Sequence, residues 1–199
     1  MNEKTDKKRR KLIAATTIIG GAGVVGVMVP FIASMNPSER SRSAGAPITI
    51  DFSQLEAGQQ LTAVWRGKPI WVLRRTQQNL EDINKSTILR GYLRDPDSEV
   101  ETQQPAYARN VYRSIRPEYL VVIAICTHLG CVPTYRPERA PEDLGPDWVG
   151  GYYCPCHGSR FDLAGRVFKN VPAPTNLVIP PYRYLSDTKV IIGEDTVST

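Results

Sequence analysis

The feature that most restricts the fold of this chain is a run of 24 residues near its N-terminus without a charged side chain, Leu12 to Met35. As an α-helix rising ~1.5 Å per residue, this run would be ~36 Å long, enough to cross a hydrocarbon core of ~30 Å. We therefore predict a single transmembrane anchor over residues 12–35, with the rest of the folded chain outside the membrane.

The charges beside this run predict its orientation. Residues 1–11 contain six Lys and Arg but only two acidic residues. Because positively charged flanks stay in the cytoplasm, we expect residues 1–11 to be a cytoplasmic tail, the anchor to lie in the cell inner membrane and the head to be periplasmic. Arg9-Arg10 before an apolar run is also typical of a twin-arginine (Tat) export signal. The tail accounts for most of the net charge of +5, so no folded basic face is indicated and we predict no nucleic-acid binding.

Two short motifs in this region have alternative interpretations. Gly21 to Gly26 matches G-x-G-x-x-G, but a dinucleotide site needs that motif between a strand and a helix. We interpret these glycines as small residues that allow close helix packing. Ala44-Gly45-Ala46 matches a signal-peptidase site, but a cleaved apolar segment usually has about 7 to 15 residues, so we expect the anchor to be retained.

The remainder of the chain is predicted to be a hinge followed by one head domain. Residues 36–47 are rich in Ser, Pro and charge, which indicates a flexible hinge. Residues 48–199 have the pattern of a mostly antiparallel β domain, with expected strands at Leu61–Trp65, Ile70–Leu73, Leu120–Ile125, Arg183–Leu185 and Val190–Ile192. One helix is expected at Thr76–Thr87, with Thr76 as N-cap. Residues 94–118 and 136–150 are expected to be long surface loops.

All four cysteines and both histidines lie within 32 residues, in the boxes Cys126-Thr-His128-Leu-Gly-Cys131 and Cys154-Pro-Cys156-His157-Gly-Ser159. Two disulfides would explain four cysteines in an exported domain but not the histidines. A structural zinc site would use both residue types, although zinc motifs usually begin C-x₂₋₄-C. A third interpretation is a 2Fe-2S cluster with one Cys-His pair from each box. Two imidazoles in place of thiolates raise the potential to roughly −150 to +300 mV, which suits a quinol as donor.

With both boxes, the basic tail, the anchor, the linker and the β head, the chain resembles the Rieske iron-sulfur subunit of the bacterial ubiquinol-cytochrome c reductase (cytochrome bc) complex over nearly its whole length. The resemblance implies a mostly antiparallel β Rieske head with a smaller cluster-binding subdomain at about residues 121–177, one short helix and a single N-terminal transmembrane helix. It also implies one Rieske-type 2Fe-2S cluster, with Cys126 and Cys154 on one iron, His128 and His157 on the other, and a disulfide between Cys131 and Cys156.

The resemblance gives roles to further residues. Ser159 matches a serine that bonds a bridging sulfide of the cluster, and Val171–Leu177 resembles a proline-rich loop that closes over it, with Val171 where Gly is usual. Phe161 stands where many members carry a tyrosine bonded to a ligand-cysteine sulfur. Since hydrogen bonds to sulfur tune the potential, we expect a somewhat lower potential than in tyrosine-bearing relatives.

The function that the resemblance implies is electron transfer. The head would oxidise ubiquinol by one coupled electron and proton, with His157 as the catalytic residue that meets the quinol, and pass the electron to a cytochrome c-type subunit. The implied partners are cytochrome b and that membrane-bound subunit, in a dimeric, proton-translocating complex, between which the hinge lets the head move. The alternatives are a Rieske ferredoxin, a zinc-held interaction module and, closest, the Rieske small subunit of a periplasmic molybdenum oxidase.

Overall fold

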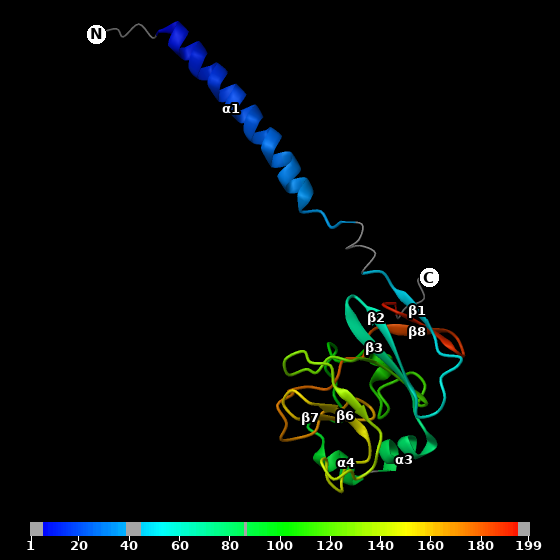
Figure 1. Cartoon of the computed structure of the whole chain (residues 1–199). Coiled ribbons are helices and arrows are strands. Elements are labelled where there is room, and N and C mark those ends of the chain that lie inside the picture. The colour runs from blue at the N-terminus through cyan, green and yellow to red at the C-terminus, as the bar shows by residue number, and fades with distance from the viewer. Residues whose placement is uncertain (1–5, 39–44, 86, 195–199) are drawn as a thin grey trace. The chain divides into compact units, whose positions relative to one another are not determined.

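The computed structural model describes residues 6–38, 45–85 and 87–194 (Figure 1). The chain divides into two compact units, Met1–Ala44 and Gly45–Thr199. Half of the predicted hinge, residues 39–44, lies outside the described residues, as do residues 1–5 of the predicted tail.

The first unit contains helix α1, Lys7–Ser34. It begins inside the predicted basic tail, because the Asp6 side chain accepts a hydrogen bond from the Lys8 N–H at 3.0 Å and caps the helix there. The hydroxyls of Thr16 and Thr17 each donate to the Ile13 carbonyl at 2.9 Å, so both polar groups are satisfied within the helix. An 18-residue stretch of α1 has a mean hydropathy of 2.1, so the helix is long and apolar enough to cross a membrane.

The second unit is built on three antiparallel sheets of three strands each, which confirms the predicted mostly antiparallel β head. The sheet orders are β1-β9-β8, β2-β3-β4 and β5-β6-β7. The strands are β1 Ile48–Asp51, β2 Gln60–Trp65, β3 Lys68–Arg74, β4 Tyr119–Ile123, β5 Thr134–Arg136, β6 Gly151–Cys154, β7 Ser159–Asp162, β8 Tyr182–Ser186 and β9 Lys189–Ile192.

The hairpin of β2 and β3 follows the predicted pattern. Its two-residue turn, Arg66-Gly67, has positive φ at both positions, 51° and 71°, as the tight turns that match strand twist require. Strand β3 is central in its sheet and buries Ile70 to Leu73. This continuous apolar run explains why the sequence identified the strand.

The helices differ in part from the prediction. Helix α3, Gln77–Lys85, starts where expected: Thr76 Oγ1 accepts from the Asn79 N–H at 3.1 Å, and Asn79 Oδ1 accepts from the Thr76 N–H at 3.0 Å. The prediction of a single helix is wrong, because α4, Thr87–Tyr92, and the 3₁₀ turn η1, Ala106–Ala108, are also present. Both are too short to produce a recognisable 3.6-residue period.

The two predicted surface loops are not wholly on the surface. Gln104 and Arg113 are buried in the first segment, and Leu144 and Trp148 in the second. The first segment buries polar side chains because they are paired: the Arg113 guanidinium donates to main-chain carbonyls, including that of Leu177 at 2.7 Å. Polar composition was therefore a poor guide to exposure here.

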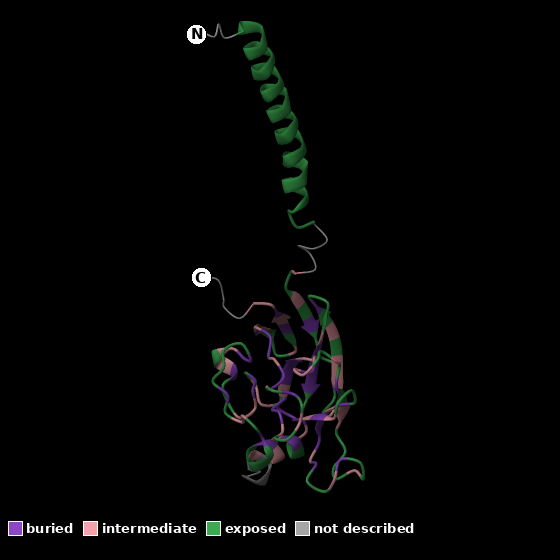
Figure 2. Ribbon diagram, turned by 90° about the vertical axis from the view of Figure 1, so that its left-hand side faces the viewer, coloured by how far each residue is buried: buried purple, intermediate pink, exposed green. Residues whose placement is uncertain are grey.

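One hydrophobic core joins the three sheets (Figure 2). It includes Ile50 of β1, Val72 of β3, Leu120 of β4, and Tyr152 and Phe161 of the β6–β7 hairpin. The two Cys/His boxes follow β4 and connect β6 to β7, so both are attached directly to this core.

Candidate metal centre

The first box forms a compact loop after β4. The Cys126 N–H donates to the Cys131 carbonyl at 2.7 Å, and the Gly130 N–H donates to the Cys126 carbonyl at 3.0 Å. Gly130 has a φ of +84°, a conformation that favours glycine at this position of the box. The loop buries Cys126, whereas the Leu129 side chain is 71% exposed at its tip.

The second box is the connection of the β6–β7 hairpin. Cys154, the last residue of β6, pairs with Ser159, the first of β7. The Gly158 N–H donates to the Cys154 carbonyl at 2.9 Å, with Gly158 at a φ of +75°. Cys154 is buried and His157 is exposed, so one short loop presents one candidate ligand inward and another toward solvent.

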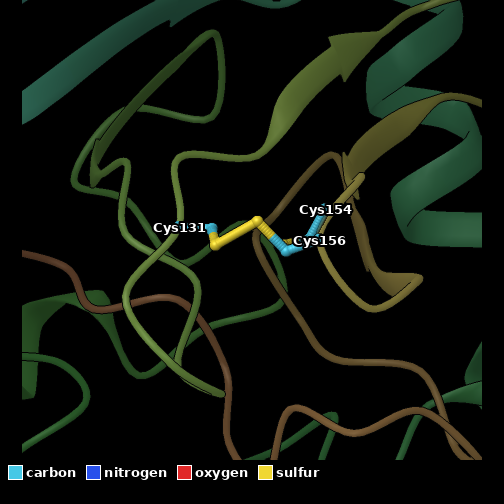
Figure 3. A group of neighbouring side chains, drawn as sticks. All are labelled: Cys131, Cys154 and Cys156. Atoms are coloured by element: carbon cyan, nitrogen blue, oxygen red, sulfur yellow. A yellow bond between two sulfur atoms is a disulfide. The ribbon is translucent and has the colours of Figure 1, made fainter.

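A disulfide between Cys131 and Cys156 joins the two loops, with Cα atoms 6.7 Å apart. Figure 3 shows Cys154 beside this bond, and the sulfur atoms of the three cysteines lie within 4.8 Å of one another. Cys126 and Cys154 are free and buried. The alternative of two disulfides is therefore wrong, and the two remaining thiols are the ones available to a metal.

The histidines lie beside each other, with ring centroids 4.7 Å apart and ring planes at 87°. The Nδ1 atom of His128 is buried and has no hydrogen-bond partner. A buried nitrogen without a partner is costly, and ligation of a metal would satisfy it.

The thiols are equally suited to a metal. Burial raises the pKa of the Cys126 thiol, and its side chain contacts that of Cys154. A coordinating metal ion deprotonates such a thiol outright and compensates the buried charge. Two adjacent buried thiols and two adjacent imidazoles thus fit a centre with two Cys and two His ligands.

A third loop is hydrogen-bonded to both boxes. The fully buried Ser159 Oγ accepts from the Ala173 N–H at 3.0 Å, and Thr127 Oγ1 donates to the Thr175 carbonyl at 2.7 Å. The proline-rich segment Val171–Leu177 is thereby held against the two loops. The role of Thr127 was not predicted, although its position inside the first box was the available signal.

The aromatic residue of β7, Phe161, is fully buried beside Ser159. Val171 is half-buried, and its carbonyl accepts from Arg94 Nη2 at 2.9 Å. This bond attaches the start of the proline-rich segment to the chain after α4.

Beyond the hairpin, buried charges support the turn after β7. Asp162 and Arg166 form an ion pair at 2.6 Å with both side chains fully buried. Arg75 Nε donates to the Leu163 carbonyl at 3.1 Å, and Arg113 Nη1 donates to that of Ala164 at 3.1 Å. Burial lowers the pKa of Arg75 to about 10 and that of Arg113 to about 9. No sequence motif indicated these arginines.

Two family models match the chain. The model described as "Rieske [2Fe-2S] domain" matches residues 92–183, which include both boxes and the proline-rich segment. The model described as "Ubiquitinol-cytochrome C reductase Fe-S subunit TAT signal" matches residues 1–38, which include α1.

Curated proteins match over most of the chain. The ubiquinol-cytochrome c reductase iron-sulfur subunit of Allochromatium vinosum is 60% identical over 188 residues, 94% of this chain and 89% of that protein. The corresponding subunit of Blastochloris viridis is 42% identical, over 94% of this chain and 92% of that protein. The mitochondrial cytochrome b-c1 complex subunit Rieske of Theropithecus gelada is 38% identical, over 92% of this chain and 58% of that protein.

Proposed function

The chain belongs to the Rieske iron-sulfur subunits of ubiquinol-cytochrome c reductase, and from this membership we propose how its own residues act in electron transfer. As such a subunit it takes part in electron transfer in the cytochrome bc1 complex and carries one Rieske-type 2Fe-2S cluster. When bound, the cluster supplies a one-electron acceptor of high potential.

We propose that Cys126 and Cys154 bind one iron and that His128 and His157 bind the other. The assignment rests on three observations: both thiols are free and buried, the two imidazoles lie beside each other, and the His128 Nδ1 is buried without a hydrogen-bond partner. The disulfide uses the other two cysteines, so they are not available as ligands.

His157 is the residue that we propose meets ubiquinol. Its ring is exposed at the tip of the hairpin loop, whereas His128 is partly buried. With one ring nitrogen on iron, the other ring nitrogen of His157 would, when deprotonated, accept a hydrogen bond from the quinol hydroxyl and take its proton as the electron leaves. The disulfide joins the two loops, and the proline-rich segment is hydrogen-bonded to both of them.

Membership in the family implies cytochrome b and cytochrome c1 as partners in a membrane complex, and α1 is the anchor. We further propose a dimeric complex, with α1 in the inner membrane, its N-terminus cytoplasmic and the head periplasmic. The basic residues before α1 and a disulfide that needs an oxidising compartment support this orientation. A molybdenum oxidase subunit is not favoured, because the relatives named above are subunits of ubiquinol-cytochrome c reductase or the cytochrome b-c1 complex.

The proposed organisation is a tail at residues 1–11, an anchor at 12–35, a hinge at 36–47 and a head at 48–199 whose cluster-binding part is about 121–177. The hinge lets the head reach the quinol site and the cytochrome c1 subunit in turn. Prolines introduced into the hinge should slow turnover and leave the cluster spectrum unchanged; equal turnover would count against movement of the head.

The test of the whole proposal is low-temperature electron paramagnetic resonance of ascorbate-reduced membranes, with and without a quinol-site inhibitor. A rhombic signal averaging below the free-electron g value would identify the mixed Cys/His cluster, and its shift by inhibitor would locate His157 at a quinol site. We expect His157→Ala to abolish cluster assembly or quinol oxidation. Normal turnover of that variant would refute the role of His157, and zinc in place of iron would refute the cluster ligands.

A further inference from the structure

The segment that enters the head is hydrogen-bonded to the β2–β3 hairpin before the first strand begins. The Trp65 indole Nε1–H donates to the Ala46 carbonyl at 3.1 Å, and Arg66 Nε donates to the Gly45 carbonyl at 3.3 Å. Strand β1 starts only at Ile48. Residues 45–47 therefore precede the first strand and are attached to the β2–β3 hairpin by two side chains.

These two side chains are held in place by the fold. The Trp65 side chain is 6% exposed, and a Cβ built on Gly193 would lie 3.0 Å from its ring, so the indole packs directly on the chain after β9. The Arg66 guanidinium carbon lies 4.5 Å from the centroid of the same ring, a cation–π distance. We call Trp65, Arg66 and the two carbonyls that they bind the tether clasp.

The clasp changes where the hinge ends. The compact unit of the head begins at Gly45, not at Ile48. We propose that Trp65 is a positioning residue that attaches Gly45–Pro47 to the head. It thereby sets the length of the tether, the stretch between α1 and the head that is not attached to the head, and this length controls how often the head reaches its partners. This inference rests on the proposed movement of the head between quinol and cytochrome sites.

The expected effect follows from tether length. With the clasp closed, the tether comprises the nine residues 36–44, and with the clasp open it comprises the twelve residues 36–47. Because effective concentration falls roughly as the −3/2 power of tether length, opening the clasp should lower the docking rate about 1.5-fold. Deletion of three tether residues should restore the docking rate.

The first experiment uses Trp65→Phe in the intact complex, which removes the indole N–H and keeps an aromatic ring on Gly193. Limited proteolysis at residues 45–47 should be about fivefold faster, as expected for the loss of one net hydrogen bond that attaches this segment. Val64→Thr is the control: this neighbour in β2 is 65% exposed. An unchanged rate of proteolysis in Trp65→Phe would overturn the clasp.

The second experiment measures cytochrome c reduction by quinol. We expect about 1.5-fold slower turnover in Trp65→Phe, an unchanged cluster spectrum, and restoration when residues 41–43 are also deleted. A merely structural role of Trp65 would not be rescued by a shorter tether. Slower turnover without rescue, or faster proteolysis with parental turnover, would therefore overturn the inference. Absence of quinol oxidation in the parent complex would instead refute the proposed function.

Discussion

Replacement of Ser159 by Ala should lower both the stability of the head and the potential of the cluster. The Ser159 hydroxyl oxygen accepts a hydrogen bond from the Ala173 N–H at 3.0 Å. The hydroxyl proton remains available to donate to the sulfur of Cys126, with which Ser159 is in hydrogen-bond contact. Both Ser159 and Ala173 are fully buried. The Ala variant therefore leaves the buried Ala173 N–H without an acceptor and removes the hydroxyl that donates to the Cys126 sulfur.

The two effects have separate magnitudes. An unsatisfied buried N–H costs about 1–3 kcal/mol, and at 2–4 °C per kcal/mol for a domain of this size, a loss of about 2 kcal/mol lowers Tm by about 4–8 °C. A lost hydrogen bond of about 1–1.4 kcal/mol to sulfur lowers a one-electron potential by about 40–60 mV, because the bond stabilises the more negative, reduced state.

The assays are loss of the cluster's visible circular dichroism on heating and redox titration of the electron paramagnetic resonance signal. Ser186→Ala is a matched control, since the Ser186 hydroxyl also accepts a backbone N–H, that of Thr188 at 3.3 Å, but is exposed in β8. A Tm and potential in Ser159→Ala equal to those of the control would refute the reasoning. A lower Tm at the parental potential would refute its redox half.

Three further predictions concern residues around the site and in the core. Phe161→Tyr should raise the potential in protein-film voltammetry by adding a donor near a ligand sulfur, and an unchanged or lower value would contradict the assignment. Replacing both Cys131 and Cys156 by Ser removes a cross-link between residues 25 positions apart, so the free energy of unfolding should fall by about 3.5 kcal/mol in denaturant titrations. A loss below about 1 kcal/mol would contradict a stabilising role of the disulfide. Burial raises the pKa of Tyr182 from 10.0 to about 12, so the neutral phenol contributes fully to the stability of the head below pH 10, and this contribution is lost as the pH rises to 12. The free energy of unfolding should therefore fall by up to about 2.7 kcal/mol between pH 10 and pH 12. In Tyr182→Phe the free energy of unfolding should depend less on pH over this range.

The sequence predicted those parts of the fold where local patterns are long enough to be read. Strand β3 has a continuous buried run, and α3 has reciprocal hydrogen bonds between Thr76 and Asn79 at its start. Strands β1, β5, β6 and β7 were not predicted, because their three or four residues mix polar and apolar side chains with too little alternation to identify them. Strand β9 is equally short, but it contains the uninterrupted apolar run Val190–Ile192. Their pairing is fixed by contacts between residues far apart in the sequence.

The four candidate ligands could be chosen from the sequence, because Cys and His hold a cluster of this type and their spacing is visible in the two boxes. That they bind the cluster stays a prediction. What the sequence did not reveal is the support around the ligands. Thr127 and Ser159 reach the proline-rich segment 48 and 14 residues away. Trp65 and Arg66 bind the entering segment 19 and 21 residues away, although nothing in β2 distinguishes them from ordinary strand and turn residues.

This long-range support explains how exposed loops can hold a fixed geometry. In its proposed role His157 would have to be exposed to meet a partner, yet the ligands of a redox centre need rotamers fixed by surrounding contacts. The hairpin loop is fixed at one side by the disulfide to the first box and at the other by the Ser159 bond to Ala173. The turn after β7 is in turn fixed by Arg75 and Arg113, whose guanidinium groups satisfy its carbonyls from 88 and 51 residues away. The turn after β7 therefore depends for its position on residues outside 121–177, and in the proposed movement between partners the whole head, not that segment alone, would be the unit that moves.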